Sequence, residues 1–330
     1  MLQYAVGLDL GGTNIKAALV ERKSGIIASE RIPTEAEHGV GHVLARIENA
    51  VRRMLRSASD KHVCGIGIGA PGTVNLQRTN LIHPPNIPGW TVVDVRAELQ
   101  RRLGHHLHVV VENDANAAAL GSAHYGTGRP YDSFVMVTLG TGVGGAIIWN
   151  NSIFRGSTGA AGEVGHMTVD SDGPEDEAGV KGAIEAYLGV RHLSRHARRQ
   201  LKAFPDSCLY EIAGADLVRL TPEMLSKAAS RGDEGALSVL EWAGQKLGAV
   251  LGACINLLDI RTIIVGGGVS AAGTLILDPA RRSILAYIKP GMRDGVDILR
   301  ETLGNKAGML GAAYLVFELL DRHASTSEES

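Results

Sequence analysis

The sequence has few cysteines and no long apolar segment. Its three cysteines, Cys64, Cys208 and Cys254, stand far apart without metal-ligand spacing, which predicts inert, buried thiols in a reducing cytoplasm. No apolar run reaches the ~18 residues that a membrane-spanning helix needs. The first ten residues lack a basic segment and a small-residue cleavage site, so we expect no secretory signal and a cytoplasmic location.

The sequence also lacks an excess of charge of either sign. Its 33 Lys and Arg nearly balance 35 Asp and Glu, for a formal net charge of −2, and its basic pairs are scattered. A nucleic-acid-binding domain typically concentrates positive charge on one face. We therefore expect a small-molecule partner, and neither nucleic acid nor a membrane.

Glycine, in contrast, is abundant. The 42 glycines are about 13% of the chain, against roughly 7% in average proteins, and they follow no Gly-X-Y period. Only 11 prolines accompany them, so collagen-like and low-complexity structures are excluded. With 45% apolar and 21% charged residues, the composition is globular, and 330 residues predict about two domains.

Strands and helices alternate along the chain, which indicates an α/β fold. Short apolar runs predict strands at 4–10, 15–20, 26–32, 62–68, 107–111 and 262–265. Apolar residues at helical spacing predict helices at 41–57, 93–103, 184–202, 234–258 and 308–320. Thr221 followed by a proline predicts a further helix start.

The start of the chain is echoed 129 residues later. Segment 6–13 (VGLDLGGT) resembles segment 135–142 (VMVTLGTG), and each predicts a strand, a glycine turn, a second strand and a polar turn. Two domains built on one βββ plan would place two glycine hairpins face to face across a cleft. Any two β-hairpins look alike at this level, so the pattern alone leaves both duplication and coincidence open.

The second glycine turn matches the G-x-G-x-x-G pattern over 140–145. In a dinucleotide-binding domain this turn opens a helix, whose N-terminus holds the pyrophosphate. Here the residues that follow, AIIW, predict a strand, so the sequence disfavours a Rossmann domain. The G-x-x-x-x-G-K-[ST] pattern of a P-loop is absent from the sequence.

Both glycine turns can present backbone N–H groups to an anion. The hydroxyls of Thr138 and Thr141 accompany the second turn, and Lys16 lies three residues beyond Thr13 of the first. Asp9 ends the first strand, where a carboxylate would repel a phosphate unless Mg²⁺ lay between them. Two such turns, one with an aspartate, favour a bound metal–nucleotide over two ordinary tight hairpins.

Asn113 and Asp114 follow a predicted strand and precede an alanine-rich helix at 117–124. The carboxyl ends of strands in open α/β sheets are where ligands bind. Asp114 could accept a proton from a substrate hydroxyl, as the general base does in phosphoryl transfer. Either residue could instead cap the helix, which is the commoner role of Asn and Asp at such a position.

A glycine-flanked loop holds Glu163 and His166. The downstream carboxylates lack the ligand order of a calcium-binding loop. We therefore interpret the acidic segment as a solvated loop rather than a metal site. Its carboxylates are those of Asp170, Asp172, Glu175, Asp176 and Glu177.

Together these segments resemble the ROK family, whose sugar kinases and transcriptional repressors share the hexokinase–actin–Hsp70 ATPase fold. The resemblance covers nearly the whole chain, and PNIPGW with AGEVGH makes it greatest for the glucokinase-type members. The ordered motifs are GLDLGGTNIKAALV, GIGIGAPG, PPNIPGW, ENDANAAALG, LGTGVGGAI, GAAGEVGHM, GAIEAY, NLLDIRTIIVGGGVS and AGMLGAA. The family implies an α/β, two-domain ribonuclease H-like (actin-like ATPase) fold, with duplicated βββ-containing domains flanking a cleft that closes on the sugar. The small domain would comprise 1–117 and 304–330, and the large domain 118–303.

The resemblance also implies roles for individual residues. Asp114 would be the catalytic base, and Asp9 would hold the Mg²⁺ of the ATP complex through water. The sugar would be bound by Gly72, Asn86, Asn113, Asp114, Glu163, His166 and Glu185. ATP would be bound by Asp9, Gly11, Gly12, Thr13, Lys16, Thr138, Gly140, Thr141, Gly142, Gly144, Gly266, Gly267 and Gly268. A sugar held by polar side chains needs no aromatic platform, which suits a chain with only 3 Trp, 7 Tyr and 4 Phe.

The chain departs from the family pattern at two places. Family members usually carry a Cys-x-Cys-Gly-x-x-Gly-Cys zinc motif, and the cysteine positions are here Asp176, Ala178 and Ala183. Since His166 is then the only candidate ligand left, the sequence predicts that no structural zinc binds. The second departure is Ser122, where the family commonly has Glu, and the sequence suggests no consequence for it.

The resemblance implies transfer of the ATP γ-phosphoryl group to a hexose, most simply to the 6-hydroxyl of glucose, by a homodimer. The alternative is a kinase for fructose, mannose, N-acetylmannosamine or a cyclitol, because the lost zinc loop normally braces His166. A sugar-sensing regulator is a further alternative, although the first strand begins by Tyr4 and leaves no room for an N-terminal helix-turn-helix. The sequence does not decide the acceptor, the choice between ATP and polyphosphate, or the oligomeric state.

Overall fold

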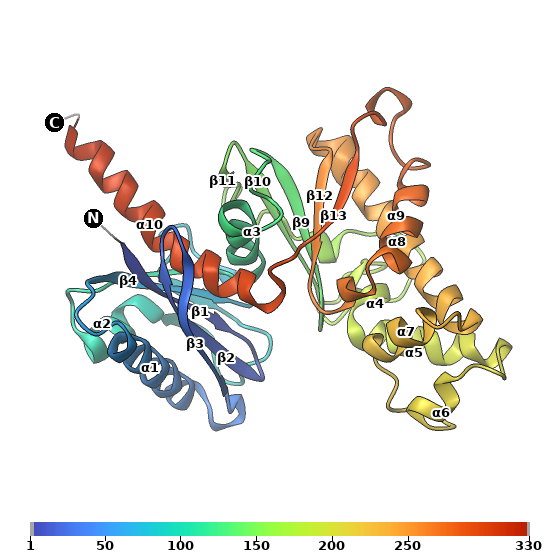
Figure 1. Ribbon diagram of the computed structural model, residues 1–330, viewed down its shortest axis with the longest axis horizontal. Coiled ribbons are helices and arrows are strands. Elements are labelled where there is room, and N and C mark those ends of the chain that lie inside the picture. The colour runs from blue at the N-terminus through green and yellow to red at the C-terminus, as the bar shows by residue number, and fades with distance from the viewer. Residues whose placement is uncertain (1–2, 329–330) are drawn as a thin grey trace. The chain divides into compact units, whose positions relative to one another are not determined.

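The computed structural model describes residues 3–328, with side-chain surroundings for residues 3–322 (Figure 1). The chain forms two compact units. Unit 1 comprises Met1–Asp132, Ile147–Ala161 and Asn305–Ser330, and unit 2 comprises Ser133–Ala146 and Gly162–Gly304. The domains expected from the sequence, 1–117 with 304–330 and 118–303, remain a prediction.

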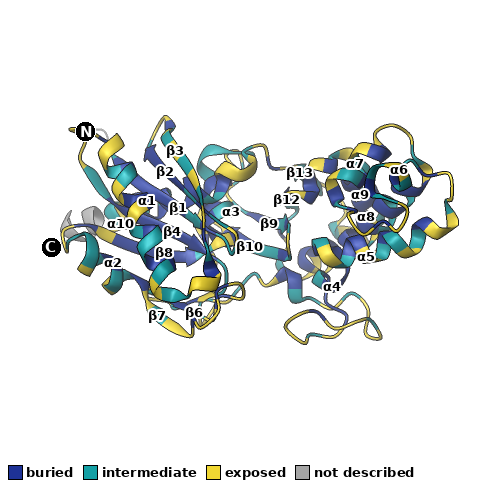
Figure 2. Ribbon diagram, turned by 90° about the horizontal axis from the view of Figure 1, so that it is seen from below, coloured by how far each residue is buried: buried dark blue, intermediate teal, exposed yellow. Residues whose placement is uncertain are grey.

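A five-stranded sheet forms the centre of unit 1, in the order β3-β2-β1-β4-β8. Its strands are β1 (Tyr4–Leu10), β2 (Asn14–Glu21), β3 (Gly25–Pro33), β4 (Val63–Ala70) and β8 (His108–Asn113). The first three form an antiparallel meander, whereas β1, β4 and β8 are parallel. Strand β1 is buried at almost every position, as the dark ribbon of Figure 2 shows, because helices cover both faces of the sheet.

Four helices cover this sheet: α1 (Val40–Ser57), α2 (Val95–Leu103), α3 (Asp114–Tyr125) and α10 (Ala307–Glu328). Figure 1 shows α1 and α2 on one face and α10 on the other, where it packs on β1, β4 and α3. Glycines permit this close approach. A Cβ at Gly67 of β4 would lie 1.7 Å from the carbonyl oxygen of Ala312, so the helix backbone rests directly on the sheet.

The segment 70–90, for which the sequence predicted no strand, contains most of a small antiparallel sheet. Its strands are β5 (Thr73–Val74), β6 (Asn80–Ile82) and β7 (Val92–Asp94). Trp90 is buried beneath it and donates its indole N–H to the carbonyl of Leu81, at 3.2 Å. The sequence did not predict these strands because each has too few residues to show the alternation of apolar and polar residues that is typical of a strand.

A second five-stranded sheet has the order β11-β10-β9-β12-β13. Its strands are β9 (Phe134–Leu139), β10 (Val143–Trp149), β11 (Ser152–Ile153), β12 (Thr262–Gly266) and β13 (Asp297–Arg300). Strands β9, β12 and β13 are parallel, and β10 pairs antiparallel with β11. The order matches the first sheet strand for strand, which confirms the duplicated βββ plan that the family resemblance implies and decides the choice that the 129-residue repeat left open.

The helices of unit 2 are α4 (Glu185–Leu188), α5 (Val190–Gln200), α6 (Leu209–Ala213), α7 (Pro222–Ala229), α8 (Glu234–Leu258) and α9 (Thr274–Ile284). The single helix expected at 184–202 is broken at Gly189. Thr221 caps α7, as predicted, by accepting the N–H of Met224. Glycines again permit close packing, since a Cβ at Gly244 of α8 would lie 2.5 Å from Cβ of Pro279 on α9.

Short 3₁₀ segments complete the fold. They are η1 (Ala36–His38), η2 (Val164–His166), η3 (Leu201–Ala203), η4 (Val269–Ala272), η5 (Pro290–Met292) and η6 (Gly304–Lys306). All three cysteines are free, but only Cys254 is buried, so the expectation of three buried thiols was wrong for Cys64 and Cys208. Within residues 3–328, no helix combines the length and the apolar character that a membrane crossing requires.

Candidate functional site

The carboxyl ends of three strands meet at one edge of the unit 1 sheet, because β1, β4 and β8 are parallel and in register. Asp9 pairs with Gly69, and Gly69 pairs with Glu112. The segments that follow these strands are therefore neighbours. They include the first glycine turn, 11–13, and the predicted base Asp114.

Further contacts draw predicted sugar-binding residues to the same edge. The side-chain amide of Asn113 donates to the carbonyl of Gly72, with an N···O distance of 3.2 Å. A Cβ at Gly12 would lie 2.5 Å from Cβ of Asn86, so only glycine lets the first turn pack against this asparagine. Unit 1 thus brings its predicted sugar and phosphate residues together.

Helix α3 begins at Asp114, and Asn113 is its N-cap. The Asn113 Oδ1 accepts the backbone N–H groups of Ala115 and Asn116, at 2.9 and 3.2 Å. Asp114 is the first helical residue, and its exposed carboxylate also accepts the N–H of Ala115, at 2.9 Å. The capping role thus belongs to Asn113, and the helix N-terminus stabilises the negative charge of Asp114.

A buried ion pair, which sequence reasoning missed, fixes the end of β8. Glu112 is 2% exposed, and its Oε2 accepts from Nε of Arg155 at 2.8 Å. Its Oε1 accepts from the backbone N–H of Asn113 and the side-chain amide of Asn116, both at 3.1 Å. The pair holds the backbone that carries Asp114. A charged residue ending an otherwise apolar strand was the available signal.

Asp9 and Lys16 form an ion pair beside the first glycine turn. The two residues are opposite each other in the β1–β2 hairpin, and Nζ lies 2.8 Å from Oδ2. Both side chains are partly exposed, at 22% for Asp9 and 24% for Lys16. A carboxylate oxygen next to backbone amides that are predicted to bind phosphate is a donor set that fits Mg²⁺. Asp9 is therefore the side chain in this turn suited to hold the ion.

The nucleotide residues predicted in unit 2 also form one group. Thr138 is the last but one residue of β9 and is paired with Gly266 of β12. Gly267 has φ +83°, and a Cβ there would lie 2.3 Å from the carbonyl oxygen of Leu139. Only glycine can therefore pass the end of β9 this closely. The segment 266–268 lies beside the second glycine turn as a result.

Glu185, a predicted sugar ligand, contacts the second glycine turn. It is the first residue of α4, and its Oε2 accepts the backbone N–H of Val143 at 2.8 Å. A Cβ at Gly142 would lie 2.2 Å from the same oxygen. This carboxylate therefore also supports the turn that is predicted to bind phosphate. Gly144 lies in β10, directly after the turn.

His166 ends η2 and is hydrogen-bonded to Asp176, with 2.6 Å between Nδ1 and Oδ2. Burial lowers the pKa of His166, but the hydrogen bond and charge of Asp176 raise it by more, so the net pKa is above its usual value. On the other side of the ring, Nε2 lies 3.9 Å from Oε2 of Glu163. The two predicted sugar ligands of this loop are therefore adjacent.

The burial of Asp176 corrects the interpretation of the acidic segment. Its side chain is 0% exposed, so it does not belong to a solvated loop. The other four carboxylates of the segment are exposed, as expected. Burial disfavours the charged form of Asp176, but hydrogen bonds from Val180 and His166 outweigh this effect and lower its pKa.

The positions matched to the family's zinc cysteines do not form a zinc site. Ala178 and Ala183 have no ligand atom, and the Asp176 carboxylate is engaged by His166 and by two backbone N–H groups. Structural zinc needs four ligands in tetrahedral geometry, so this donor set does not fit the ion. That no zinc binds remains a prediction for metal analysis.

Ser122, the second departure from the family pattern, is buried in α3. Its hydroxyl accepts the N–H of Gly128 at 3.1 Å, and its carbonyl accepts the N–H of Gly126 at 2.9 Å. Ser122 therefore holds the turn that ends α3.

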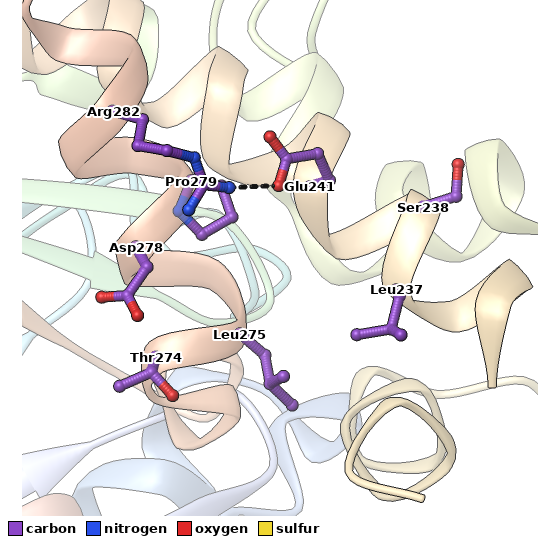
Figure 3. Close-up of a pocket in the computed structure, with 8 residues that line it drawn as sticks. All are labelled: Leu237, Ser238, Glu241, Thr274, Leu275, Asp278, Pro279 and Arg282. Atoms are coloured by element: carbon purple, nitrogen blue, oxygen red, sulfur yellow. Dashed lines mark hydrogen bonds and ion pairs between the residues drawn. The ribbon is translucent and has the colours of Figure 1, made fainter. Parts of the chain in front are cut away.

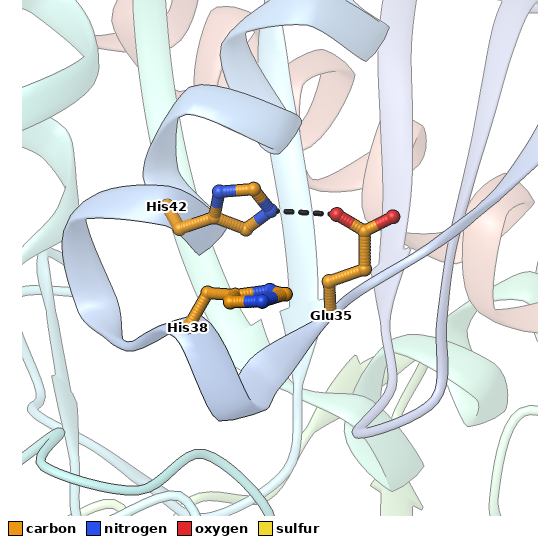
Figure 4. Close-up of side chains that lie close together, drawn as sticks. All are labelled: Glu35, His38 and His42. Atoms are coloured by element: carbon orange, nitrogen blue, oxygen red, sulfur yellow. Dashed lines mark hydrogen bonds and ion pairs between the residues drawn. The ribbon is translucent and has the colours of Figure 1, made fainter.

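One group of potential metal ligands lies outside the predicted site. Figure 4 shows Glu35, His38 and His42 at the start of α1, and their ligand atoms lie within 4.8 Å of one another. Oε2 of Glu35 is 2.7 Å from Nε2 of His42 and 3.4 Å from Nη1 of Arg46. These partners hold the carboxylate without an ion, so we treat the group as a surface cluster.

A pocket in unit 2 lies between α8 and α9 (Figure 3). Arg282 and Glu241 form an ion pair across it, with Nη2 and Oε2 2.6 Å apart. None of its eight lining residues belongs to the predicted site. A second pocket is lined by residues of η4 and α9, together with Ser230, Gly273, Leu299 and Arg300, and none of them belongs to the predicted site.

Two sheets of one strand order, each with a glycine turn after its first strand, define the actin-like ATPase class of fold. The chain belongs to the ROK family, whose model matches residues 5–318. The glucokinase of Streptomyces coelicolor is 36% identical over 317 residues, which cover 95% of this chain and 97% of that protein. The crystal structure of a ROK family glucokinase from Streptomyces griseus, in complex with glucose and AMPPNP, has a TM-score of 0.83. Its identity is 35%, and the match covers 94% of this chain and 98% of that one.

The family also includes regulators. The xylose repressor of Bacillus subtilis is 26% identical over 318 residues, which cover 96% of this chain and 77% of the repressor. This likeness is lower than that to the glucokinases, and it shows that the shared fold alone does not distinguish a kinase from a regulator.

Proposed function

We propose that this protein is an ATP-dependent glucokinase, which transfers the γ-phosphoryl group of ATP to the 6-hydroxyl of glucose. Glucokinases that are 36% and 32% identical over 95% of the chain support the activity. The complex of a relative with glucose and AMPPNP supports both substrates. The observation that carries the proposal is the exposed carboxylate of Asp114, which lies at the same sheet edge as the first glycine turn.

Asp114 is the proposed general base. It accepts the proton of the 6-hydroxyl as O6 bonds to the γ-phosphorus and the bond from that phosphorus to the bridging oxygen of ADP breaks. Phosphoryl transfer demands mainly positioning and charge neutralisation. The backbone N–H groups of the two glycine turns and the Lys16 ammonium supply positive charge, and Mg²⁺, held by Asp9 through water, would neutralise the phosphates.

The proposed sugar ligands are Gly72, Asn86 and Asn113, together with Glu163, His166 and Glu185. A site with several polar contacts strongly rejects analogues that lack a hydroxyl, because its own groups are left unpaired. These residues would therefore decide between glucose and mannose, fructose, N-acetylmannosamine or a cyclitol. The adenosine would contact the segment 266–268.

The Asp114→Asn variant tests the base assignment. We expect kcat to fall by about 10³-fold, since general-base catalysis accelerates a reaction by a factor on the order of 10²–10⁴. Glucose affinity, measured by calorimetry, should change little. Asp60→Asn, which removes an exposed carboxylate elsewhere in unit 1, is the matched control. An Asp114→Asn enzyme that retains kcat would refute the assignment.

The acceptor, the donor and the oligomeric state need separate measurements. ADP release with Mg-ATP across hexoses, amino sugars and cyclitols, repeated with polyphosphate, would identify both substrates. Light scattering would test the expected homodimer. A protein that binds sugars without turnover but binds DNA at low salt would instead be a regulator.

A further inference from the structure

His166 is hydrogen-bonded to a buried carboxylate, that of Asp176. The carboxylate is fully buried, in a loop whose other acidic residues are exposed. Burying a charged group is unfavourable unless it is paired and hydrogen-bonded. A carboxylate kept in this position therefore has a role that a solvated acid could not perform.

Asp176 is held rigidly at the centre of a tight turn. Its Oδ1 accepts the backbone N–H groups of Ala178 and Val180, at 2.9 and 2.8 Å. The backbone N–H of Asp176 in turn donates to the carbonyl of Val180, at 3.1 Å. Because Oδ1 is engaged by two donors, Oδ2 is directed at His166, and the carboxylate cannot rotate without breaking both bonds.

This geometry determines which ring nitrogen of His166 carries the proton. A carboxylate only accepts hydrogen bonds, so Nδ1, 2.6 Å from Oδ2, must donate. In the neutral ring, Nε2 is then an acceptor. The oxygen of Glu163 is 3.9 Å from Nε2, which is too far for a hydrogen bond between them.

We infer that Asp176 is a positioning residue that fixes His166 in the tautomer whose Nε2 accepts a hydrogen bond from a sugar hydroxyl. The inference rests on the proposed sugar-binding role of His166 and adds the kind of group recognised there, a hydroxyl that donates. Asp176 occupies the first position matched to the family's zinc cysteines, so a hydrogen-bonded carboxylate braces the ring where the resemblance implies a metal.

The tautomer can be measured without substrate. In protein labelled with ¹⁵N at histidine, and assigned with a His166→Gln sample, we expect the His166 proton on Nδ1 at every pH at which the ring is neutral. In Asp176→Asn, the amide oxygen keeps the two backbone donors, so the NH₂ group faces Nδ1 and moves the proton to Nε2. A wild-type proton on Nε2 overturns the inference, even if the variant fails to fold.

Kinetics provide the second readout. Asp176→Asn should raise the KM for glucose about ten- to a hundredfold, because an Nε2–H group cannot accept the hydroxyl hydrogen, so the hydroxyl must turn its oxygen to the ring and give up its other hydrogen bonds. The KM for ATP should change less than about twofold. Asp172→Asn is the matched control, since it removes the same charge from a 95% exposed neighbour in the same loop. An unchanged glucose KM in Asp176→Asn overturns the inference.

The pH profile separates positioning from general damage. The groups that face His166 are Asp176, Glu163 and Glu185, all acidic. In the wild type, protonation of Nε2 should raise the glucose KM as pH falls through the pKa of His166. In Asp176→Asn this dependence should disappear, because Nε2 carries a proton at every pH. A wild-type enzyme with no sugar kinase activity would refute the proposed function, and the tautomer measurement would still decide the inference.

Discussion

The two glycine turns occupy equivalent places in two sheets that have the same strand order, yet the side chains beside the turns differ. At the 129-residue offset, Asp9 corresponds to Thr138 and Lys16 to Gly145. The first turn therefore has an ion pair of 2.8 Å at its side, whereas the second has a hydroxyl and no charge at these two positions. The repeated backbone thus places a glycine turn twice, each proposed to bind phosphate, and only the first carries the carboxylate proposed to hold Mg²⁺.

The two turns also differ in what holds them. The first packs against Asn86, where a Cβ at Gly12 would meet a side-chain carbon at 2.5 Å. The second is held by the Glu185 carboxylate, which accepts the N–H of Val143. A carboxylate at the end of a flexible side chain can adjust, whereas packed carbon atoms near the backbone cannot. Substitutions should therefore affect the first turn more than the second.

The largest effect is expected from Asp9→Thr, which gives the first turn the residue of the second. Loss of the carboxylate removes the proposed magnesium ligand and leaves Lys16 without its partner. We expect kcat/KM for ATP to fall by about 10³-fold, as for other charged groups that stabilise a transition state. ADP release at several Mg²⁺ concentrations measures it, with Asp60→Thr as the control. Wild-type activity in Asp9→Thr would mean that the two turns do not differ in function.

Two ion pairs, one in each unit, extend the comparison to stability. Arg155→Met leaves the buried Glu112 unpaired, and we expect the free energy of unfolding to fall by about 3 kcal/mol. Arg282→Met breaks an exposed pair with Glu241 in unit 2, which should cost less than about 1 kcal/mol. Urea unfolding of both variants measures the difference. Equal losses would contradict the supporting role of the Glu112 pair.

Alanine substitutions compare the turns directly. Gly12→Ala should lower kcat/KM by about 10²-fold, because a displacement of about 1 Å at an active site has effects of that order. Gly142→Ala should have a smaller effect, since the Glu185 side chain can move away. Steady-state kinetics with both substrates would measure this, with Gly41→Ala on the surface of α1 as a control. A larger loss in Gly142→Ala would reverse our ranking of the two turns.

The smallest effect concerns pH. Burial lowers the pKa of His124 to about 4, and its ring stacks on Tyr314 at 3.4 Å. The unfolded chain binds this proton near pH 6.5 and the folded chain does not, so stability is lost as pH falls from 6.5 towards 4. We expect the free energy of unfolding to fall by about 2 kcal/mol between pH 7 and pH 5, as measured by urea unfolding. The His124→Gln variant should show a flatter profile, and an unchanged slope would contradict this origin.

Local patterns predicted most of the fold. The helix expected at 234–258 is α8 to the residue, and the repeat indicated matching sheets without excluding a coincidence between two hairpins. What the sequence did not reveal depends on contacts between distant segments. The burial of Glu112 requires Arg155, 43 residues away, and the burial of Asp176 requires a turn that folds around its carboxylate. An acidic residue among other acidic residues carries no local sign of such a partner.

The brace on His166 has a consequence for the conditions under which the loop keeps its shape. A cysteine-bound zinc ion is lost when thiols are oxidised or when chelators compete for the metal. The carboxylate of Asp176 is indifferent to both, and it needs no metal supply during folding. The brace is instead sensitive to acid, because protonation of the Asp176 carboxylate would remove the hydrogen-bond acceptor that holds the His166 ring. If metal analysis finds no zinc, the loop of this chain would depend on acidity where a zinc loop depends on redox state and metal availability.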